Sequence, residues 1–224
     1  MAANFYNVKG FCKITNNAVF VNGRIQHEVP QIPFAQFAEE TYKHFKISYP
    51  KFYKMDNLSK LGFLTTELLF ENLQLKANHK PDRIGIIVSN KSSSLDTDIK
   101  YYNMVKKGVA SPAVFVYTLP NILIGEICIR HNIKGENTFF VSEEYDIPSN
   151  VNYVNGLFES GMMDACICGW IELMNEEYES FLYLVEKEKV KNLLEHSASN
   201  IEKIYNQKPS VYAGVNARSE KTDC

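Results

Sequence analysis

One cysteine and one histidine have the spacing of a nucleophile and its base. Cys128 and His131 are three residues apart in an apolar segment, so in a helix their side chains would be neighbours. A thiol beside an imidazole can support covalent catalysis. The apolar surroundings favour another interpretation, in which Cys128 is a small core residue and His131 is the polar end of the helix. We therefore expect no catalytic pair here.

Two further cysteines, Cys166 and Cys168, alternate along a predicted strand and face the same side of it. They would begin a metal site only if two more ligands converged on them. The sequence offers no second Cys-x-Cys or paired histidines nearby, so we interpret both as core residues. No metal is predicted.

A run of three serines, Ser92 to Ser94, could offer hydroxyls to the phosphate of a phosphopantetheine arm. A solvated loop is the favoured interpretation, because the chain has no Gly-x-x-x-x-Gly-Lys phosphate cradle. It also has no Gly-x-Ser-x-Gly elbow, dinucleotide fingerprint or zinc motif. We predict no cofactor.

The composition describes a folded chain that carries little net charge. Its 224 residues are 45% hydrophobic and 22% charged, which suits a single α/β domain. A net charge of -2 and a pI near 6.2 disfavour binding to nucleic acid or to an anionic membrane. Five cysteines without a regular framework favour a reducing compartment. No apolar segment approaches the ~20 residues of a membrane span, and we expect a soluble, cytoplasmic protein.

Hydrophobic periodicity predicts the elements that must position these residues. We expect a β ribbon within residues 1–30, then alternating helices and strands, and finally two adjacent antiparallel strands. The helices are predicted from Asp56 or Asn57 to about Asn78, after the loop at 90–98 with Tyr101, Tyr102 and Met104, over 120–131, over 151–161 and over 190–204. The strands are predicted at 83–89, 137–142, 164–173 and 178–187, the first two of them as short buried strands. This order predicts an α/β fold with a mainly parallel mixed sheet and helices on both faces.

The predicted helix that follows Pro120 is apolar around most of its circumference. Only Glu126 interrupts the run from Ile122 to Ile129, so we expect the helix to be buried on most faces. Gly125 in its middle costs roughly 1 kcal/mol relative to alanine. A close approach by another backbone would explain that glycine.

The segment 111–146 resembles the part of β-ketoacyl-ACP synthases that precedes their active-site cysteine. Pro112, Asn121, Gly125, Gly135 and Ser142 fall where that pattern has a proline-led strand, an Asn-x-x-x-Gly helix and a Gly-led strand. Three flanking segments are also similar to the family. These are residues 50–69, residues 83–98, and residues 156–173, the last ending in Gly169-Trp170-Ile171-Glu172 where the family has Gly-Gly-x-Glu. The resemblance covers roughly residues 45–187 and implies a thiolase-like fold.

In this resemblance the position of the nucleophilic cysteine is Glu144. A carboxylate cannot form the acyl thioester that condensation requires. The family also takes two histidines, or a histidine and an asparagine, from a second half-domain, for which 224 residues leave no room. The resemblance therefore implies one amino-terminal-type domain over 1–224, with a core at about 45–187, a terminal helix and loose tail at 188–224, and no condensing activity of its own.

The resemblance further implies a partner. Half of a thiolase-like fold exposes a helix face that the whole fold buries, which predicts association with a full-length ketosynthase or self-association. We expect a subunit similar to chain length factors of aryl-polyene and related pigment pathways, with an acyl carrier protein as a possible further partner. The residues expected at the partner interface and acyl tunnel are Val114, Thr118, Leu119, Ile122 and Gly125. Two alternatives remain, a decarboxylase or acyl-ACP hydrolase that uses Glu144, and an acyl-carrier docking module.

Overall fold

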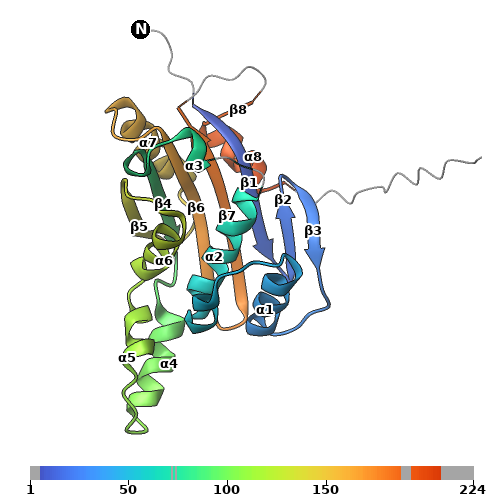
Figure 1. Cartoon of the computed structure of the whole chain (residues 1–224), viewed down its shortest axis with the longest axis vertical. Coiled ribbons are helices and arrows are strands. Elements are labelled where there is room, and N and C mark those ends of the chain that lie inside the picture. Colours follow the sequence, from blue (N-terminus) through green and yellow to red (C-terminus); the bar gives the residue numbers. More distant parts are fainter. Residues whose placement is uncertain (1–5, 72, 74, 188–192, 208–224) are drawn as a thin grey trace, which may run out of the picture.

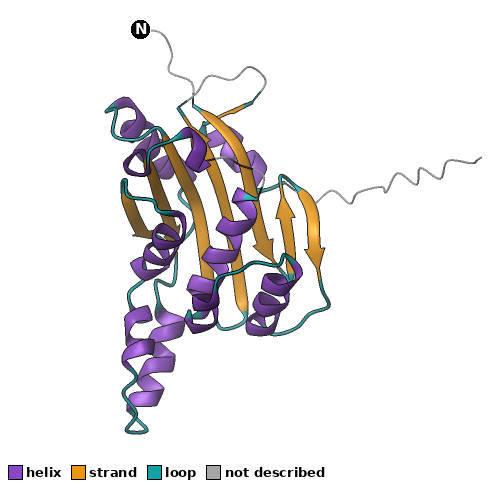
Figure 2. Ribbon diagram, in the orientation of Figure 1, coloured by secondary structure: helices purple, strands orange, loops and turns teal. Residues whose placement is uncertain are grey.

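The chain is built on one eight-stranded sheet with helices on both faces (Figures 1 and 2). The computed structural model describes residues 6–71, 73, 75–187 and 193–207. The sheet has the order β3-β2-β1-β7-β6-β4-β5, and the short β8 pairs with β1. The strands are β1 Asn7–Thr15, β2 Ala18–Val21, β3 Arg24–Glu28, β4 Ile84–Asn90, β5 Asn137–Val141, β6 Ala165–Met174, β7 Glu177–Glu186 and β8 Leu194–Glu195.

The predicted amino-terminal ribbon is confirmed as β1, β2 and β3. Asn16 and Asn17 form the first turn with φ of 49° and 58°, and Asn22 and Gly23 form the second with φ of 51° and 77°. Asparagine and glycine tolerate this left-handed backbone, whose twist suits a two-residue hairpin.

The predicted α/β class and mixed sheet are confirmed, but the sheet is mainly antiparallel and not mainly parallel as expected. Parallel pairing is confined to β4, which lies between β5 and β6. The remaining strand pairs are antiparallel. In three of them, β1–β2, β2–β3 and β6–β7, the strands follow one another through a tight turn, as β6 and β7 do across Asn175 and Glu176.

Two apolar clusters fill the two faces of the sheet. One lies under α1, α2 and α6, with Phe37, Leu64 and Ile127 wholly buried. The other lies under α7 and α8, with Phe158 and Ile201 wholly buried. The helices are α1 Phe34–His44, η1 Pro50–Lys54, α2 Asn57–Phe70, α3 Leu75–Asn78, η2 Pro81–Arg83, α4 Leu95–Val105, α5 Pro112–Phe115, η3 Val116–Thr118, α6 Asn121–His131, α7 Ile147–Glu159 and α8 Ala198–Tyr205.

The helix predicted from Asp56 or Asn57 is confirmed at its start. The Asp56 carboxylate caps α2 by accepting from the Ser59 amide at 2.9 Å and also accepts from the Thr97 hydroxyl at 2.7 Å. Burial raises the pKa of Asp56, although these hydrogen bonds oppose the rise. The carboxylate therefore joins the start of α2 to α4.

Several predictions are corrected. The helix expected to reach about Asn78 ends at Phe70, with α3 as a separate short helix, and α1 was not predicted. Residues 113–118, expected as a proline-led strand, form α5 and η3, because Pro112 takes the first helical turn and Ser111 caps it by accepting from the Val114 amide. The final helix begins only at Ala198, after the Ser197 cap. Leu194 pairs with Val8 in β8 instead, and Val190 and the tail from 208 lie outside the described residues.

The helices α4 and α5 project beyond the lower end of the sheet as a pair (Figure 1). Within the described part of the chain, no single helix has the length and apolar character to cross a membrane. Residues Pro112–Thr118 and Asn121–His131 meet that test only when taken together, and the chain bends by 102° between them.

Candidate functional site

Glu144 lies on the turn between β5 and α7 and its side chain is exposed. The Ser142 hydroxyl donates to the Glu144 carbonyl at 2.7 Å, and Asp146 caps α7 by accepting from the Ser149 amide at 3.1 Å. Among the described residues the Glu144 carboxylate forms no ion pair. These two hydrogen bonds hold the turn, and the Glu144 carboxylate faces solvent.

A cavity of about 280 Å³ lies beside this turn, at the carboxyl ends of β4 and β5. Its walls carry serine hydroxyls, one carboxylate, one amide and two aromatic rings, and they include neither a thiol nor an imidazole. The lining residues are Ser89, Phe140, Val141, Ser142, Asp146, Ser149, Asn150 and Tyr153. These groups can bind an apolar molecule with a few hydrogen bonds.

The space behind the turn is filled by aromatic side chains. The ring of Tyr145 lies 5.9 Å from that of Trp170 and 5.5 Å from that of Tyr205. Tyr205, from α8, also lies 5.3 Å from Phe181. Trp170, which replaces a glycine of the family motif, therefore packs directly against the residue that follows Glu144.

A buried histidine joins α7, β7 and the segment before α8. His196 is 4% exposed, and its ring nitrogens lie 2.8 Å from Asn155 Oδ1 and 3.0 Å from Tyr183 Oη. A neutral ring satisfies both contacts if Nδ1 donates to the amide oxygen and Nε2 accepts from the hydroxyl. Burial lowers the pKa of His196 to about 4.

We expect this histidine to make the fold sensitive to acid. The unfolded chain takes up a proton near pH 6.5 and the folded chain only near pH 4, so the free energy of unfolding falls as the pH is lowered between these values. The loss by pH 5 should be about 2 kcal/mol. Urea unfolding at pH 7.5 and pH 5 measures it. The variant His196→Gln should lose most of this pH dependence, and an unchanged difference in that variant would contradict the assignment.

Cys128 and His131 are not brought together as a pair. His131 Nε2 lies 2.8 Å from Glu67 Oε1, and Arg130 donates two hydrogen bonds to the same carboxylate. Burial alone would raise the pKa of Glu67, but the bonds from His131 and Arg130 outweigh it and lower the pKa to about 2. Burial raises the pKa of the Cys128 thiol to about 11, so the thiolate is disfavoured and the structural interpretation stands.

The other candidates from the sequence also have structural surroundings. Cys166 and Cys168 are wholly buried on one side of β6, and burial raises the pKa of Cys168 well above its usual value. Ser94 donates to the Thr118 carbonyl at 2.7 Å. Glu172 accepts from the amides of Lys91 and Ser92, so the serine loop is tied to the end of β6.

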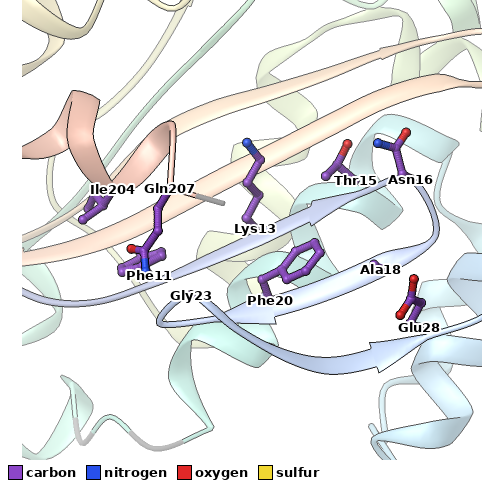
Figure 3. A pocket seen from close by; sticks show the side chains of 10 residues that line it. All are labelled: Phe11, Lys13, Thr15, Asn16, Ala18, Phe20, Gly23, Glu28, Ile204 and Gln207. Atoms are coloured by element: carbon purple, nitrogen blue, oxygen red, sulfur yellow. The ribbon is translucent and has the colours of Figure 1, made fainter. Parts of the chain in front are cut away.

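A second cavity, of about 250 Å³, lies over the ribbon of β1, β2 and β3 (Figure 3). Lys13 lines it, but its ammonium group already lies 2.6 Å from Glu179 and donates to the Tyr205 carbonyl at 3.2 Å. This cavity therefore presents an apolar floor beside a cation that is already paired.

The exposed apolar side chains are concentrated on one part of the molecule. Eleven of the fifteen large ones found in the described residues fall between residues 95 and 141. The elements in this stretch touch in sequence, α4 with α5, α5 with η3, η3 with α6, and α6 with β5. We call the surface formed by ten of them the apolar face; its exposed members are Leu95, Ile99, Tyr102, Val105, Val109, Phe115, Val116, Leu119, Ile129 and Val141. Phe140 lies on the other side of β5, where its ring is 5.4 Å from that of Tyr153 on α7.

The size of the apolar face is that of a subunit interface. Eight aliphatic and two aromatic side chains at about half exposure present on the order of 700 Å² of surface. A standard interface takes about 800 Å² from each partner, and the largest apolar patch of a typical monomer is roughly 300–600 Å². The outer surfaces of α7 and α8 are mostly polar, with Asn152, Glu202 and Lys203 exposed and Tyr153 as the one exposed large apolar side chain in the two helices. Association is thus expected on the α6 side.

The five residues predicted at the interface lie together on the corner formed by α5, η3 and α6. Leu119 is 53% exposed, and Val114, Thr118, Ile122 and Gly125 are half-buried. The expectation that α6 is buried on most faces is confirmed, because only Asn121 and Ile129 among its residues are exposed. Leu123, Ile124 and Ile127 pack inward, whereas Ile129 is 67% exposed. Their roles in a tunnel remain predictions.

Gly125 has open space around it. A Cβ built there meets no atom within 4 Å. The glycine that α2 and α6 need for their own contact is Gly62, whose added Cβ would lie 2.9 Å from Leu123. The close approach predicted at Gly125 is therefore not made by the described chain, and an external backbone can seat between Ile122 and Ile129.

The two edges of the sheet differ in how they are protected. The β3 edge carries Arg24 and Glu28, and its pairing with β2 is irregular. The β5 edge has the uncharged sequence Asn-Thr-Phe-Phe-Val in regular register with β4, with Phe140 and Val141 exposed. Charges and bulges are the usual protection of a free edge, so β5 has the character of an edge that a partner covers.

The fold is similar to solved ketosynthase and chain length factor structures. A structure described as the ishigamide ketosynthase/chain length factor matches with a TM-score of 0.63 and 14% identity, over 84% of this chain and 64% of that chain. AntDE:AntF, a type II polyketide acyl-carrier protein in complex with its ketosynthase, matches with a TM-score of 0.58 and 15% identity, over 82% and 62%. The ketosynthase ApeO in complex with its chain length factor ApeC, from Xenorhabdus doucetiae, matches with a TM-score of 0.53 and 9% identity, over 82% and 79%.

These matches confirm the thiolase-like fold that the resemblance implied. The chain spans less than two thirds of the length of the first two matched chains. No protein-family model and no curated protein sequence matches it. At such low identities the likeness concerns the fold alone.

Two features of this surface escaped the sequence analysis. Strand β5 was predicted to be buried, but it forms an open edge of the sheet. Its lack of charged residues, in contrast to the charged edge strand β3, was the signal that could have singled it out. Glu126 was noted only as an interruption of an apolar run. Its partner Tyr117 is nine residues away, a spacing that no local pattern reveals.

Proposed function

We propose, on the premise of this fold, that the chain is a non-catalytic ketosynthase-like subunit that pairs with a full-length ketosynthase. The observation that carries the proposal is the apolar face, which combines an unprotected β5 edge with an open glycine on α6. Glu144 supports the non-catalytic role, because the resemblance aligns its exposed carboxylate with the nucleophilic cysteine of the synthases.

The proposal extends to acyl chain length in fatty-acid or polyketide biosynthesis of the aryl-polyene type. In synthase dimers one subunit closes the far end of the acyl tunnel of the other, and Leu119 and Thr118 stand on an exposed corner of the apolar face. A side chain that enters the partner's tunnel there would limit its depth.

We expect a bulkier residue at this corner to shorten the product. The ketosynthase that co-purifies with the tagged chain from its host would be reconstituted with the variant Leu119→Trp and assayed with acyl carrier protein and malonyl units. The product should lose one extension unit or more, and Leu119→Ala should lengthen it. The control is Leu193→Trp, at an exposed leucine outside the apolar face. Unchanged product length in both Leu119 variants would contradict the chain-length role.

The purified chain without its ketosynthase separates the two alternative functions, an enzyme that uses Glu144 and an acyl-carrier docking module. The chain alone, incubated with malonyl-ACP or acyl-ACP, should release no product. Turnover that Glu144→Gln abolishes would instead establish a decarboxylase or hydrolase. Carrier-protein binding by the isolated chain, without any synthase, would favour the docking module.

A further inference from the structure

Glu126 is a buried carboxylate in the middle of α6. It is 4% exposed, and burying such a group is costly unless it is bonded and paired. The Tyr117 hydroxyl donates to Oε1 at 2.9 Å, and the Lys51 ammonium lies 2.8 Å from Oε2. Burial and the adjacent Glu126 carboxylate both raise the pKa of Tyr117, so the hydroxyl stays protonated and remains a donor.

The two partners of Glu126 come from two different segments of the chain. Tyr117 belongs to η3 and is itself buried, whereas Lys51 belongs to η1 and is 43% exposed. The same turn is held a second time, because the Ser94 hydroxyl donates to the carbonyl of Thr118. The short segment that carries Thr118 and Leu119 is therefore anchored to α6 through a side chain and to the loop before α4 through its backbone.

We infer that Tyr117, Glu126 and Lys51 are positioning residues that hold the η3 turn at a fixed distance from α6. That distance sets how far Leu119 and Thr118 extend toward the partner. This inference rests on the proposed function. A bond from a neutral hydroxyl to a buried carboxylate is directional and strong, and only one residue separates Tyr117 from Leu119. If the turn were held less tightly, the Leu119 side chain would extend to several different distances into the partner's acyl tunnel.

The geometry predicts two measurable effects of Tyr117→Phe, which keeps the ring and removes the hydroxyl. In the isolated chain, the amides of residues 116–119 should exchange with deuterium about tenfold faster, as expected from losing a hydrogen bond to a charged group. In the reconstituted pair, the product should spread over neighbouring lengths. Glu126→Gln keeps an acceptor for Tyr117 and should preserve most of the length distribution.

The chain supplies a matched control in Tyr205→Phe. Tyr205 also donates to a carboxylate, Glu179, at 2.8 Å, but it lies on α8 under the other face of the sheet. That variant should leave both the exchange of 116–119 and the product distribution unchanged. If Tyr117→Phe folds poorly, Lys51→Met removes the second partner from a half-exposed position and should also speed exchange in the turn.

The outcomes separate this inference from the proposed function. If Leu119→Trp shifts product length and Tyr117→Phe broadens it, the inference is supported. If Leu119→Trp shifts product length but Tyr117→Phe neither broadens it nor speeds exchange, the positioning role is overturned while the proposed function stands. If exchange alone changes, the residues are structural only. If Leu119→Trp has no effect, the proposed function fails and the inference with it.

Discussion

Replacing Gly169 with alanine is expected to remove about 4 kcal/mol or more of the free energy of unfolding, or to prevent folding. A Cβ at this position would lie 1.9 Å from the Phe181 carbonyl oxygen on β7. The backbone also has φ of 151°, a region that essentially only glycine adopts. Because β6 and β7 are paired along their whole length in the centre of the sheet, neither strand can move away.

Gly161→Ala is the matched control for this variant. Gly161 also has a positive φ, of 73°, but open space surrounds its Cβ position, so alanine there should cost only about 1–2 kcal/mol. Urea unfolding of both variants, followed by circular dichroism, measures the difference. Equal losses would show that the β7 carbonyl is not an obstacle. The result matters for the candidate site because Gly169 and Glu172 lie in the same strand. The Glu172 carboxylate holds the serine loop by accepting from the amides of Lys91 and Ser92.

Replacing Gly125 with leucine is expected to weaken association with the partner about 100-fold or more. The space at Gly125 is open in the isolated chain, so the fold should tolerate the substitution. A leucine there would stand between Ile122 and Ile129 and hold an incoming backbone away from α6. Losing close contact at the centre of an interface commonly costs 2 kcal/mol or more, and 2.8 kcal/mol corresponds to 100-fold.

Gly156 provides the control for Gly125. It lies within α7, and a Cβ there also meets nothing within 4 Å, but it is far from the apolar face. Alanine at either position should stabilise the isolated chain by up to about 1 kcal/mol, because both glycines lie inside helices. Binding of the co-purified ketosynthase, measured by isothermal titration, should fall for Gly125→Leu and not for Gly156→Leu. Equal affinities would place the interface elsewhere.

The local pattern of the sequence was sufficient for most of the fold. Asn16-Asn17 and Asn22-Gly23 specified the turns of the ribbon through their tolerance of left-handed backbone, and Asp56 specified the start of α2. The strand at 113–118 came from the family pattern and was wrong, because Ser111 and Pro112 start a helix here. The last helix was drawn too early because Leu194 continues an apolar spacing while its backbone pairs with β1.

By itself the sequence determined the ribbon, most of the later strands and helices, the placement of a glutamate on the turn after β5 and the presence of a glycine in an apolar helix, because these depend on residues close together in the chain. Only the tertiary structure decided that Gly125 faces open space while Gly62 makes the internal contact. It likewise decided that Trp170 and Tyr205 fill the space behind Tyr145, and that Glu126 is paired with Tyr117 and Lys51. Such contacts join residues from separate elements, so their geometry exists only once the sheet and its helices have assembled.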